Sequence, residues 1–497
     1  MIGFDIVVVG AGSAGCVLAA RLSADPQCRV MLVEAGPDYP TRQDLPTDVA
    51  DASAPTLGHD WGFVAEPDQL GRQVPLPRAR LVGGCGATNA GFLIRGWPAD
   101  YDGWAAQGNP GWSFADLLPT MRAVESDDIT DQGHGRDGPI PVHRTAFAAL
   151  PPLQKVFAQA AVAAGHVAID DHNHPGAIGV GPAPRNVRDG VRMSTALTHL
   201  QPARPRPNLT VNGDALVDRV ALSGSRARGV QLASGEVITA DRVVLAAGTY
   251  ASPAILLRSG IGPAAHLREM SVEVVADLPG VGANLADHPL VAVDLQCSVA
   301  PDSRPFDVIL SMRSSLAEPG DPPDLHLFPA GPFDGPDGAV FGIVTGLLCV
   351  RSRGSVRLRS ADPDAPPHID PGHLRAPADL HRMVEATLHA RRLSRTPPLS
   401  DIVTGAELNP GTHISDDDTA ALVRSIRTRV GSYHHPVGTC RMGPEATAGA
   451  VVDSRGAVHG IDALWVADAS VMPSLPSANT HLSTVVIAER IATLLTA

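Results

Sequence analysis

The start of the chain constrains the fold most, because it has the pattern of a strand, a glycine-rich turn, a helix and a second strand. Residues 4–9 form a short apolar run, residues 10–15 are rich in glycine, and a helical pattern follows as far as Leu22. A second strand pattern, apolar at its centre, covers residues 29–34. This order of elements within about 30 residues is typical of the βαβ unit of a parallel sheet. We therefore expect an α/β fold with a doubly wound sheet.

The glycine turn has the spacing Gly10-x-Gly12-x-x-Gly15, and Glu34 ends the second strand pattern. Gly10 permits a tight turn, Gly12 lets the backbone approach a pyrophosphate, and Gly15 allows a helix to pack closely on a strand. A pyrophosphate would then lie at a helix N-terminus, where free N–H groups favour negative charge. A carboxylate at Glu34 can bind both ribose hydroxyls and disfavours a 2′-phosphate. The motif therefore predicts a dinucleotide, NAD or FAD, rather than NADP.

Length, charge and cysteine content exclude several classes of protein. The 497 residues predict two or three domains. A net charge of −13 with scattered arginines indicates that no nucleic acid is bound. The six cysteines contain no CxxC pair, which disfavours a disulfide framework. We also expect no membrane segment, no signal peptide and a cytoplasmic location, because no apolar run approaches roughly 18 residues and the first strand begins near residue 4.

A second glycine-rich segment and several later motifs are more specific than the first turn. Residues 83–91 read GGCGATNAG. The later segments are 247–253 (AGTYASP), 259–263 (SGIGP), 278–289 (LPGVGANLADHP), 435–443 (HPVGTCRMG) and 466–473 (VADASVMP). In content and order these segments resemble the motifs of the glucose–methanol–choline (GMC) flavoprotein family. The resemblance extends from residue 7 to residue 491 and is weakest between residues 290 and 430.

The resemblance implies two domains with the active site between them. The FAD-binding domain, Rossmann-like and doubly wound, would comprise residues 1–145, 185–291 and 428–497. The substrate domain would comprise residues 146–184 and 292–427, with an antiparallel sheet backed by helices, so that this part is α+β. The residues expected to bind FAD are Gly10, Gly12, Ser13, Ala14, Gly15, Glu34, Ala35, Arg80, Val82, Gly83, Gly84, Thr88, Asn89, Ala90, Gly91, Val217, Ala247, Gly248, Asp468, Ala469, His481 and Leu482.

Thr88 bears on how the cofactor is attached. Some members of the family link the flavin covalently through a histidine in the loop that resembles residues 83–91. This chain has Thr88 at the corresponding position, so we expect non-covalent FAD. Cys85 in the same loop is expected to be a small packed residue rather than a reactive thiol.

Two histidines are the expected catalytic pair. His435 matches the general base of the family, the histidine before proline in the HPxGT motif. In the segment 477–481 (SANTH), we assign the second active-site position to His481. A histidine suits alcohol oxidation because its ordinary pKa lies near working pH. His435 would accept the hydroxyl proton while hydride passes to flavin N5, and His481 would position the alcohol oxygen. Two neighbouring imidazoles would titrate as a coupled pair.

The expected reaction is oxidation of a primary or secondary alcohol to an aldehyde or ketone, with electrons passing to O2 or another acceptor. A sugar, nucleoside or other polyol is one candidate substrate. The low aromatic content of 4% argues against an aromatic-lined site for an aryl alcohol. Two alternatives remain, a lyase or other non-redox enzyme with structural FAD and an NAD-dependent dehydrogenase; the segments 83–91 and 435–443 argue against the second. No metal is expected, because His172-Asn173-His174 lacks a third ligand at suitable spacing.

Overall fold

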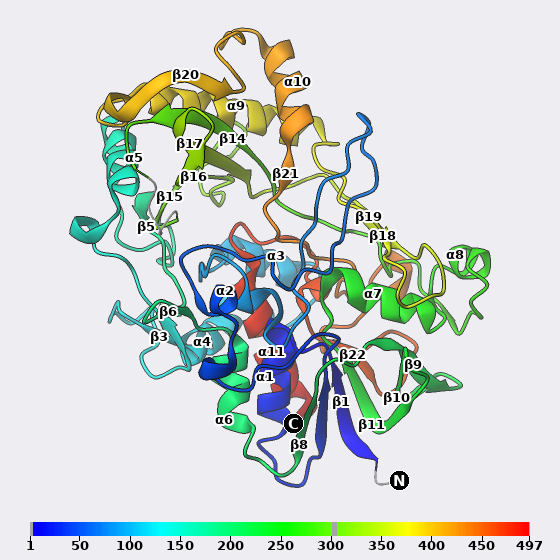
Figure 1. Ribbon diagram of the computed structural model, residues 1–497. Helices are drawn as coiled ribbons and strands as arrows, with labels where there is room; N and C mark the ends of the chain where they lie inside the picture. Colours follow the sequence, from blue (N-terminus) through cyan, green and yellow to red (C-terminus); the bar gives the residue numbers. More distant parts are fainter. Residues whose placement is uncertain (1–2, 301–305, 497) are drawn as a thin grey trace.

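The computed structural model describes residues 3–300 and 306–496, which build two large β-sheets with helices around them (Figure 1). One sheet contains the first strand of the chain and is mostly parallel. The other is antiparallel and lies at the opposite end of the molecule, in the upper part of Figure 1. The expected α/β class with an α+β second part is therefore confirmed.

The first sheet has seven strands in the order β8-β2-β1-β11-β10-β9, with β22 paired to β11. Its strands are β1 (Phe4–Val9), β2 (Val30–Val33), β8 (Leu209–Asn212), β9 (Val217–Ser223), β10 (Arg226–Leu232), β11 (Val237–Leu245) and β22 (Leu464–Val466). The pairs β8–β2, β2–β1, β1–β11 and β11–β22 are parallel, whereas β10 is antiparallel to both of its neighbours. The carboxyl ends of β1, β2, β11 and β22 therefore meet at one edge of the sheet, which is where α/β folds bind ligands.

The central strands are buried because their residues are apolar on both faces. Ile6, Val7 and Val8 of β1 are fully buried, as a strand covered on both sides requires. The helices α1 (Ser13–Leu22) and α11 (Thr480–Thr496) lie side by side against this part of the molecule (Figure 1). A Cβ on Gly15 would lie 1.8 Å from the carbonyl oxygen of Gly10, so only glycine permits this helix to approach the turn.

The second sheet has seven strands in the order β20-β14-β17-β16-β15-β5, with β21 paired to β14. Its strands are β5 (Gly179–Pro182), β14 (Pro289–Cys297), β15 (Val308–Met312), β16 (Leu325–Gly335), β17 (Gly338–Leu347), β20 (Val403–Asn409) and β21 (Gly431–Ser432). The helices α5 (Pro152–Ala163) and α9 (Pro377–Ser394) pack on this sheet, and α10 (Thr419–Arg429) packs on α9. The two expected domains and their boundaries stay a prediction.

Shorter elements complete the described chain. The helices are α2 (Thr47–Ala50), α3 (Pro98–Ala106), α4 (Phe114–Val124), α6 (Gln201–Ala203), α7 (Gly248–Arg258) and α8 (Ala264–Glu269). The strands are β3 (Glu125–Asp127), β4 (Ile140–Val142), β6 (Val187–Arg188), β7 (Val191–Arg192), β12 (Ile261–Gly262), β13 (Ala276–Asp277), β18 (Ser355–Arg357) and β19 (His368–Asp370). Across residues 3–300 and 306–496, no helix has both the length and the apolar character needed to cross a membrane.

Candidate active site

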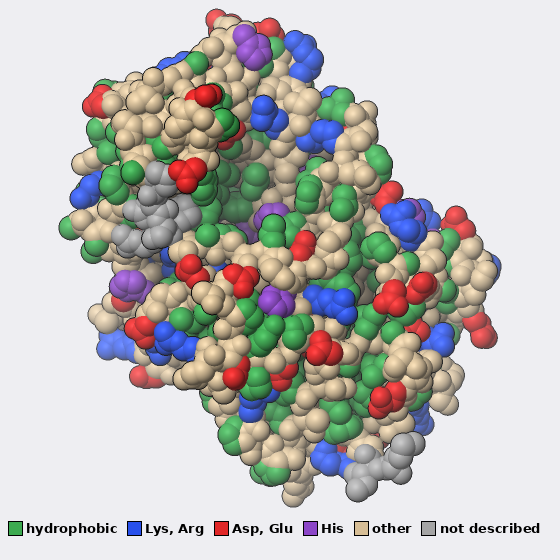
Figure 2. Space-filling model, viewed as in Figure 1, with side chains coloured by type: hydrophobic (Ala, Val, Ile, Leu, Met, Phe, Trp, Pro, Cys, Tyr) green, Lys and Arg blue, Asp and Glu red, His purple; other side chains and the backbone are tan. Residues whose placement is uncertain are grey.

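A cavity of about 660 Å³ is lined by residues from both sheets. At one end it is bounded by Gly10, which follows β1, and by Glu34, which follows β2. At the other end it is bounded by Leu290, Phe328 and Val344 of the antiparallel sheet. Figure 2 shows a hollow near the middle of the molecule, with hydrophobic side chains and histidine along its wall. The carboxyl ends of the parallel strands thus face an apolar surface across a space large enough for a ligand.

Glu34 is held at the closed end of this cavity by backbone groups. The N–H of Ala11 donates to Glu34 Oε2 at 2.8 Å, and the N–H of Gly36 donates to Oε1 at 3.0 Å. Burial raises the pKa of Glu34 to about 7, although these two hydrogen bonds favour the charged form. The carboxylate predicted to bind a ribose is therefore oriented before any ligand arrives.

The two glycine-rich segments lie against each other. A Cβ on Gly84 would lie 2.6 Å from Gly12 Cα, so two side chains could not be accommodated here. The N–H of Gly83 donates to the carbonyl oxygen of Ala11 at 2.7 Å, and Gly83 has φ +107°. No side chain caps the first turn of α1, which leaves its leading N–H groups free for an anion. Segments some 70 residues apart thus form one backbone surface, as their motifs predict.

Arg192 supports the second glycine segment from behind. Its guanidinium is buried and donates to the carbonyl oxygens of Ala87 at 2.8 Å and Asn89 at 2.5 Å. It also donates to Val49 and to two further carbonyl groups of residues 51–54. Sequence reasoning does not find this residue, because it lies about 100 positions from the segment that it supports.

Asp468 joins two strand ends. Its Oδ2 atom accepts hydrogen bonds from the N–H of Gly248 at 2.8 Å and from the hydroxyl of Ser252 at 2.6 Å. Oδ1 accepts from the N–H of Ser470 at 2.8 Å. Because Gly248 begins α7 and Asp468 follows β22, one carboxylate fixes the start of a helix beside the cavity.

His435 is held at the opposite end by a buried carboxylate. Its backbone N–H donates to Asp287 Oδ1 at 2.8 Å, while the hydroxyl of Ser432 donates to Asp287 Oδ2. His373 Nε2 lies 3.4 Å from the same carboxyl group. Burial alone would raise the pKa of Asp287, but the neighbouring His373 and Ser432 lower it well below its usual range. Asp287 belongs to the segment 278–289, which explains why that motif accompanies the HPxGT motif.

The imidazole of His435 has a polar partner at each nitrogen. Its Nδ1 atom lies 3.0 Å from Nδ1 of His288, and its Nε2 atom accepts from Asn479 Nδ2 at 3.0 Å. The ring of Tyr433 lies 4.5 Å away, between centroids. Burial, together with the nearby His288, lowers the pKa of His435 well below its ordinary value, and burial lowers that of His288 to about 4. Both imidazoles are therefore neutral near pH 7, and a neutral imidazole has a lone pair that can accept a proton.

Comparison with known proteins assigns this arrangement to a family. Residues 4–290 match the N-terminal model and residues 350–488 the C-terminal model of GMC oxidoreductase. The chain belongs to the GMC oxidoreductase family. It is 36% identical to an oxygen-dependent choline dehydrogenase of Burkholderia pseudomallei, over 98% of this chain and 93% of the relative. It is also 36% identical to a GMC-type oxidoreductase of Rhodococcus erythropolis, over 99% and 98% of the two chains.

Among solved structures, pyridoxine 4-oxidase from Mesorbium loti is similar over 99% of both chains, with a TM-score of 0.92 and 32% identity. This GMC oxidoreductase is thus an enzyme of a family that binds FAD and acts on CH–OH groups. The alternative of a plain NAD-dependent dehydrogenase is wrong.

The cavity of this GMC oxidoreductase fits an extended dinucleotide. It runs from Glu34 past both glycine segments to His435. Where Gly12 and Gly84 meet, neither residue has a side chain that could block it. Of the residues expected to bind FAD, those that line the cavity are Gly10, Gly12, Ser13, Ala14, Glu34, Ala35, Gly84, Thr88, Asn89, Ala90, Val217, Ala247, Gly248, Asp468, Ala469 and His481. Those that do not line it are Gly15, Arg80, Val82, Gly83, Gly91 and Leu482.

The structure brings Asn479, rather than His481, to His435. His481 Nδ1 lies 3.1 Å from Ser13 Oγ, and a Cβ on Gly86 would lie 2.9 Å from His481 Cε1. His481 therefore lies between α1 and the second glycine segment, where it suits the expected cofactor role. The expected pairing of His435 with His481 is replaced by the hydrogen bond to Asn479. Because α11 begins at Thr480, Asn479 precedes the helix while His481 lies in its first turn and points elsewhere.

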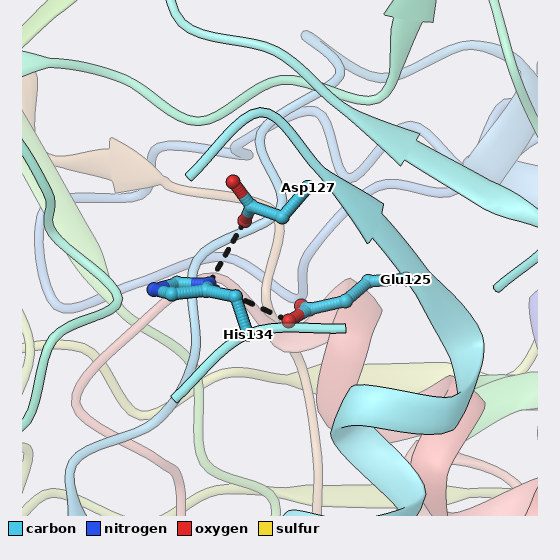
Figure 3. A group of neighbouring side chains, drawn as sticks. All are labelled: Glu125, Asp127 and His134. Atoms are coloured by element: carbon cyan, nitrogen blue, oxygen red, sulfur yellow. Dashed lines mark ion pairs between the residues drawn. The ribbon is translucent and has the colours of Figure 1, made fainter. Parts of the chain in front are cut away.

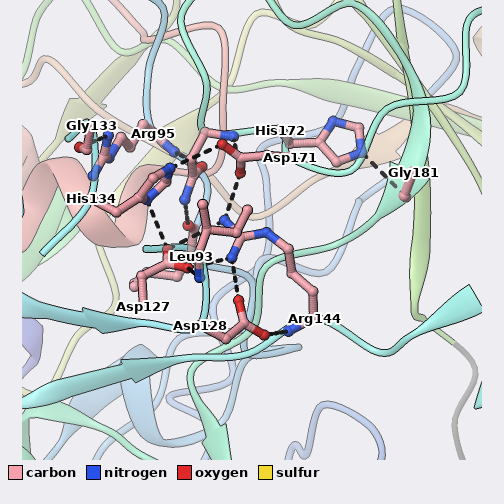
Figure 4. A network of polar contacts seen from close by, with 12 residues as sticks. Leu93, Arg95, Asp127, Asp128, Gly133, His134, Arg144, Asp171, His172 and Gly181 are labelled. Carbon is pink, nitrogen blue, oxygen red and sulfur yellow. Dashed lines mark hydrogen bonds and ion pairs between the residues drawn. The ribbon is translucent and has the colours of Figure 1, made fainter. Parts of the chain in front are cut away.

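A cluster of buried charged side chains, outside this cavity, includes potential metal ligands. Glu125, Asp127 and His134 lie close together, with His134 Nδ1 3.0 Å from an oxygen of Asp127 (Figure 3). Cationic side chains already pair with these groups. Arg95 bonds to Glu125. Arg144 bonds to Asp127 at 2.5 Å (Figure 4).

His134 is itself one of the cations in this cluster. Burial alone would lower its pKa, but hydrogen bonds to Asp127, Asp171 and Glu125 outweigh it and raise the pKa to about 11. A protonated imidazole cannot bind a metal ion. The cluster is therefore an ion-pair network that joins β3 to the loop at residue 171.

The segment His172-Asn173-His174 has a structural role at its first two residues. His172 contacts the carbonyl oxygen of Gly181 at 3.3 Å and Ser311 Oγ at 3.2 Å. Asn173 donates to the carbonyl oxygen of Leu93 at 3.0 Å. These contacts join residues 172–173 to three neighbouring segments of the chain.

Proposed function

We propose that this enzyme oxidises a primary or secondary alcohol to an aldehyde or ketone, with non-covalently bound FAD and with His435 as the general base. The observation that carries the proposal is the neutral, buried imidazole of His435 beside Asn479, at the end of a cavity whose other end is a dinucleotide cradle. Electrons leave the enzyme for O2 or another acceptor. A cytoplasmic location remains part of this proposal.

The chain offers a complete set of groups for FAD. Glu34 would bind ribose hydroxyls, and the free N–H groups of α1 with the backbone around Gly84 would bind the pyrophosphate. His481 and the start of α11 would lie toward the flavin, because Asn479, Thr480 and His481 all line the cavity. Thr88 also lines it and offers no imidazole for a covalent link, which supports dissociable FAD. When bound, FAD supplies the oxidant that accepts hydride from the alcohol carbon.

His435 takes the hydroxyl proton at Nε2. Asn479 Nδ2 is an N–H donor, so the Nε2 atom that it contacts carries a lone pair and no proton. The imidazole is neutral because burial disfavours its charged form. Removal of the hydroxyl proton lets electron density move from oxygen to carbon as the C–H bond breaks and the carbonyl forms. General base catalysis of this kind contributes about 10²–10⁴-fold in rate.

Asn479 orients the alcohol. Its amide lies beside the Nε2 atom that receives the proton, so an alcohol oxygen at this place can bond to Asn479 and His435 together. We assign Asn479 to the second active-site position in place of His481.

The test uses the purified yellow protein mixed with alcohols in the absence of oxygen. A true substrate bleaches the flavin absorbance, and the variant His435→Ala bleaches at least 100-fold more slowly while retaining its FAD. The variant His413→Ala, at an exposed position outside the cavity, is the matched control. Turnover with an unbleached flavin would instead indicate a lyase or another non-redox enzyme. Yellow colour that stays in the protein pellet after acid precipitation would contradict non-covalent FAD.

A further inference from the structure

The wall of the cavity next to His435 is apolar and aromatic. The ring centroid of Tyr433 lies 4.5 Å from that of His435. The next distances between centroids are 5.6 Å from Tyr433 to Phe328 and 6.1 Å from Phe328 to Phe306. Leu290, Val344 and Phe92 complete the wall and pack in the same hydrophobic cluster. We call these six residues, Phe92, Leu290, Phe306, Phe328, Val344 and Tyr433, the apolar wall. Although aromatic residues are few in the chain, they gather here, contrary to the expectation from composition.

The charged side chains of the cavity do not lie on the strands that carry the apolar wall. Among the described residues that line it, the charged ones are Glu34, Asp60, Arg78, Arg258, Asp364 and Asp468. None of these stands on β14, β16 or β17, the strands that carry Leu290, Phe328 and Val344. Glu34, Arg258 and Asp468 also have partners of their own, in Ala11, Asp218 and Ser252. A substrate cation seated against the apolar wall would therefore lose its water without gaining a counter-charge.

The polar groups next to the apolar wall are concentrated at one point. Asn479 is buried, and within the described residues its Oδ1 atom has no hydrogen-bond partner. His435 Nε2 lies beside the same amide, and the Tyr433 hydroxyl is close to it. This arrangement serves a single hydroxyl. Further hydroxyl groups of a polyol would lie against Phe328, Leu290 and Val344, where nothing replaces their hydrogen bonds to water.

We propose that the substrate is an uncharged alcohol with one reacting hydroxyl and an apolar body, an aromatic ring or an alkyl chain, that packs on the apolar wall. The proposal rests on the proposed alcohol oxidation and names its substrate class. It replaces a sugar, nucleoside or other polyol as the candidate. Because burial of each CH2 group favours binding about fourfold, longer alkanols bind more tightly until the wall is covered.

Binding is measured separately from catalysis in the FAD-loaded His435→Ala enzyme. Benzyl alcohol, hexan-1-ol, choline and sorbitol are titrated, and the change in flavin absorbance gives each dissociation constant. We expect benzyl alcohol and hexan-1-ol to bind at least tenfold more tightly than choline or sorbitol. Choline or sorbitol binding as tightly as the two apolar alcohols would overturn the proposal. The arm with choline matters because aromatic rings can also bind quaternary ammonium groups.

Variants of the wall test the residues themselves. Val344→Thr keeps the volume and adds a hydroxyl, and Phe328→Ala removes a ring. In the parent enzyme each raises KM for benzyl alcohol about tenfold with little change in kcat. Phe333→Ala, which removes an exposed ring from the same strand β16, leaves both constants unchanged. An unchanged KM for benzyl alcohol in both wall variants contradicts the proposal, even if one of the two folds poorly.

The two proposals fail in different ways. If apolar alcohols bind tightly but never reduce the flavin of the parent enzyme, alcohol oxidation is wrong and the binding class stands. If choline or a sugar reduces the flavin more efficiently than any apolar alcohol, alcohol oxidation stands and the substrate class is wrong.

Discussion

Nδ1 of His288 and Nδ1 of His435 lie 3.0 Å apart inside the protein, so one of the two imidazoles donates and the other accepts. Because Asn479 donates to Nε2 of His435, the proton of neutral His435 is on Nδ1. His288 is then the acceptor, and its own proton is on Nε2. This pair of hydrogen bonds selects the tautomer of His435 whose Nε2 atom has a lone pair, and that lone pair receives the substrate proton once the alcohol hydroxyl takes the place of the Asn479 N–H.

Replacing His288 is expected to slow catalysis without weakening substrate binding. In His288→Ala the Nδ1–H of His435 loses its acceptor, and the active tautomer is no longer selected. We expect kcat to fall about 10- to 100-fold with little change in KM, and the lower limb of the pH–rate profile to shift. His266→Ala also removes a buried histidine but lies outside the cavity, and should leave the rate and the pH profile unchanged. Equal effects of the two variants would show that His288 has only a structural role.

Asn479 and His481 should separate catalysis from cofactor binding. Asn479→Ala is expected to lower kcat/KM about 100-fold while the enzyme keeps its full content of FAD, because the amide contacts the base. His481→Ala should weaken FAD retention, because its ring lies between Ser13 and Gly86. Flavin absorbance after gel filtration and stopped-flow reduction rates measure the two effects. A larger rate loss in His481→Ala than in Asn479→Ala would restore the two-histidine mechanism.

The buried side chain of His172 makes stability depend on pH. Burial lowers the pKa of His172 to about 4 in the folded enzyme, against 6.5 for the ordinary side chain. Between these values the unfolded chain binds the proton and the folded chain does not, so stability falls as the pH drops from 6.5 toward 4. Between pH 6.5 and pH 4.5, the free energy of unfolding of His172→Gln should therefore fall by about 2 kcal/mol less than that of the parent. Urea unfolding at the two pH values checks this, and identical losses would refute it.

The ion-pair network around His134 should stabilise the fold without a metal. In His134→Ala the carboxylates of Glu125, Asp127 and Asp171 lose a cationic neighbour. We expect the free energy of unfolding to fall by about 3–5 kcal/mol. A chelator such as EDTA should leave the Tm of the parent enzyme unchanged. Calorimetry with and without the chelator is the measurement. A fall in Tm on chelation, reversed by adding back a divalent cation, would mean that the cluster holds a metal.

Local motifs predict the parts of the site that depend on the backbone. The spacing of Gly10, Gly12 and Gly15 predicts both the βαβ unit and the close packing of α1, since glycine is required wherever main chains touch. The antiparallel second sheet follows from family resemblance rather than from pattern. Its strands come from segments as far apart as residues 179 and 432, and pairing over such separations leaves no local signal.

Side-chain direction accounts for the errors and omissions. Asn479 and His481 are two positions apart, and only the start of α11 at Thr480 decides which one faces His435. His288 and Asp287 belong to a recognised motif, but their contact with His435 spans about 150 positions. Composition likewise gives the number of aromatic residues in the chain but not their positions, so it could not predict that several of them meet in the apolar wall.

The helix α11 packs on α1, and β22 pairs with β11, so residues after 464 complete a crevice that the earlier glycine segments begin. A ribosome-bound chain that ends before residue 464 lacks Asp468, Asn479 and His481 altogether. Such a nascent chain can form the glycine turns but not the far side of the crevice. We therefore expect cofactor loading only after residues 464–481 have left the ribosome.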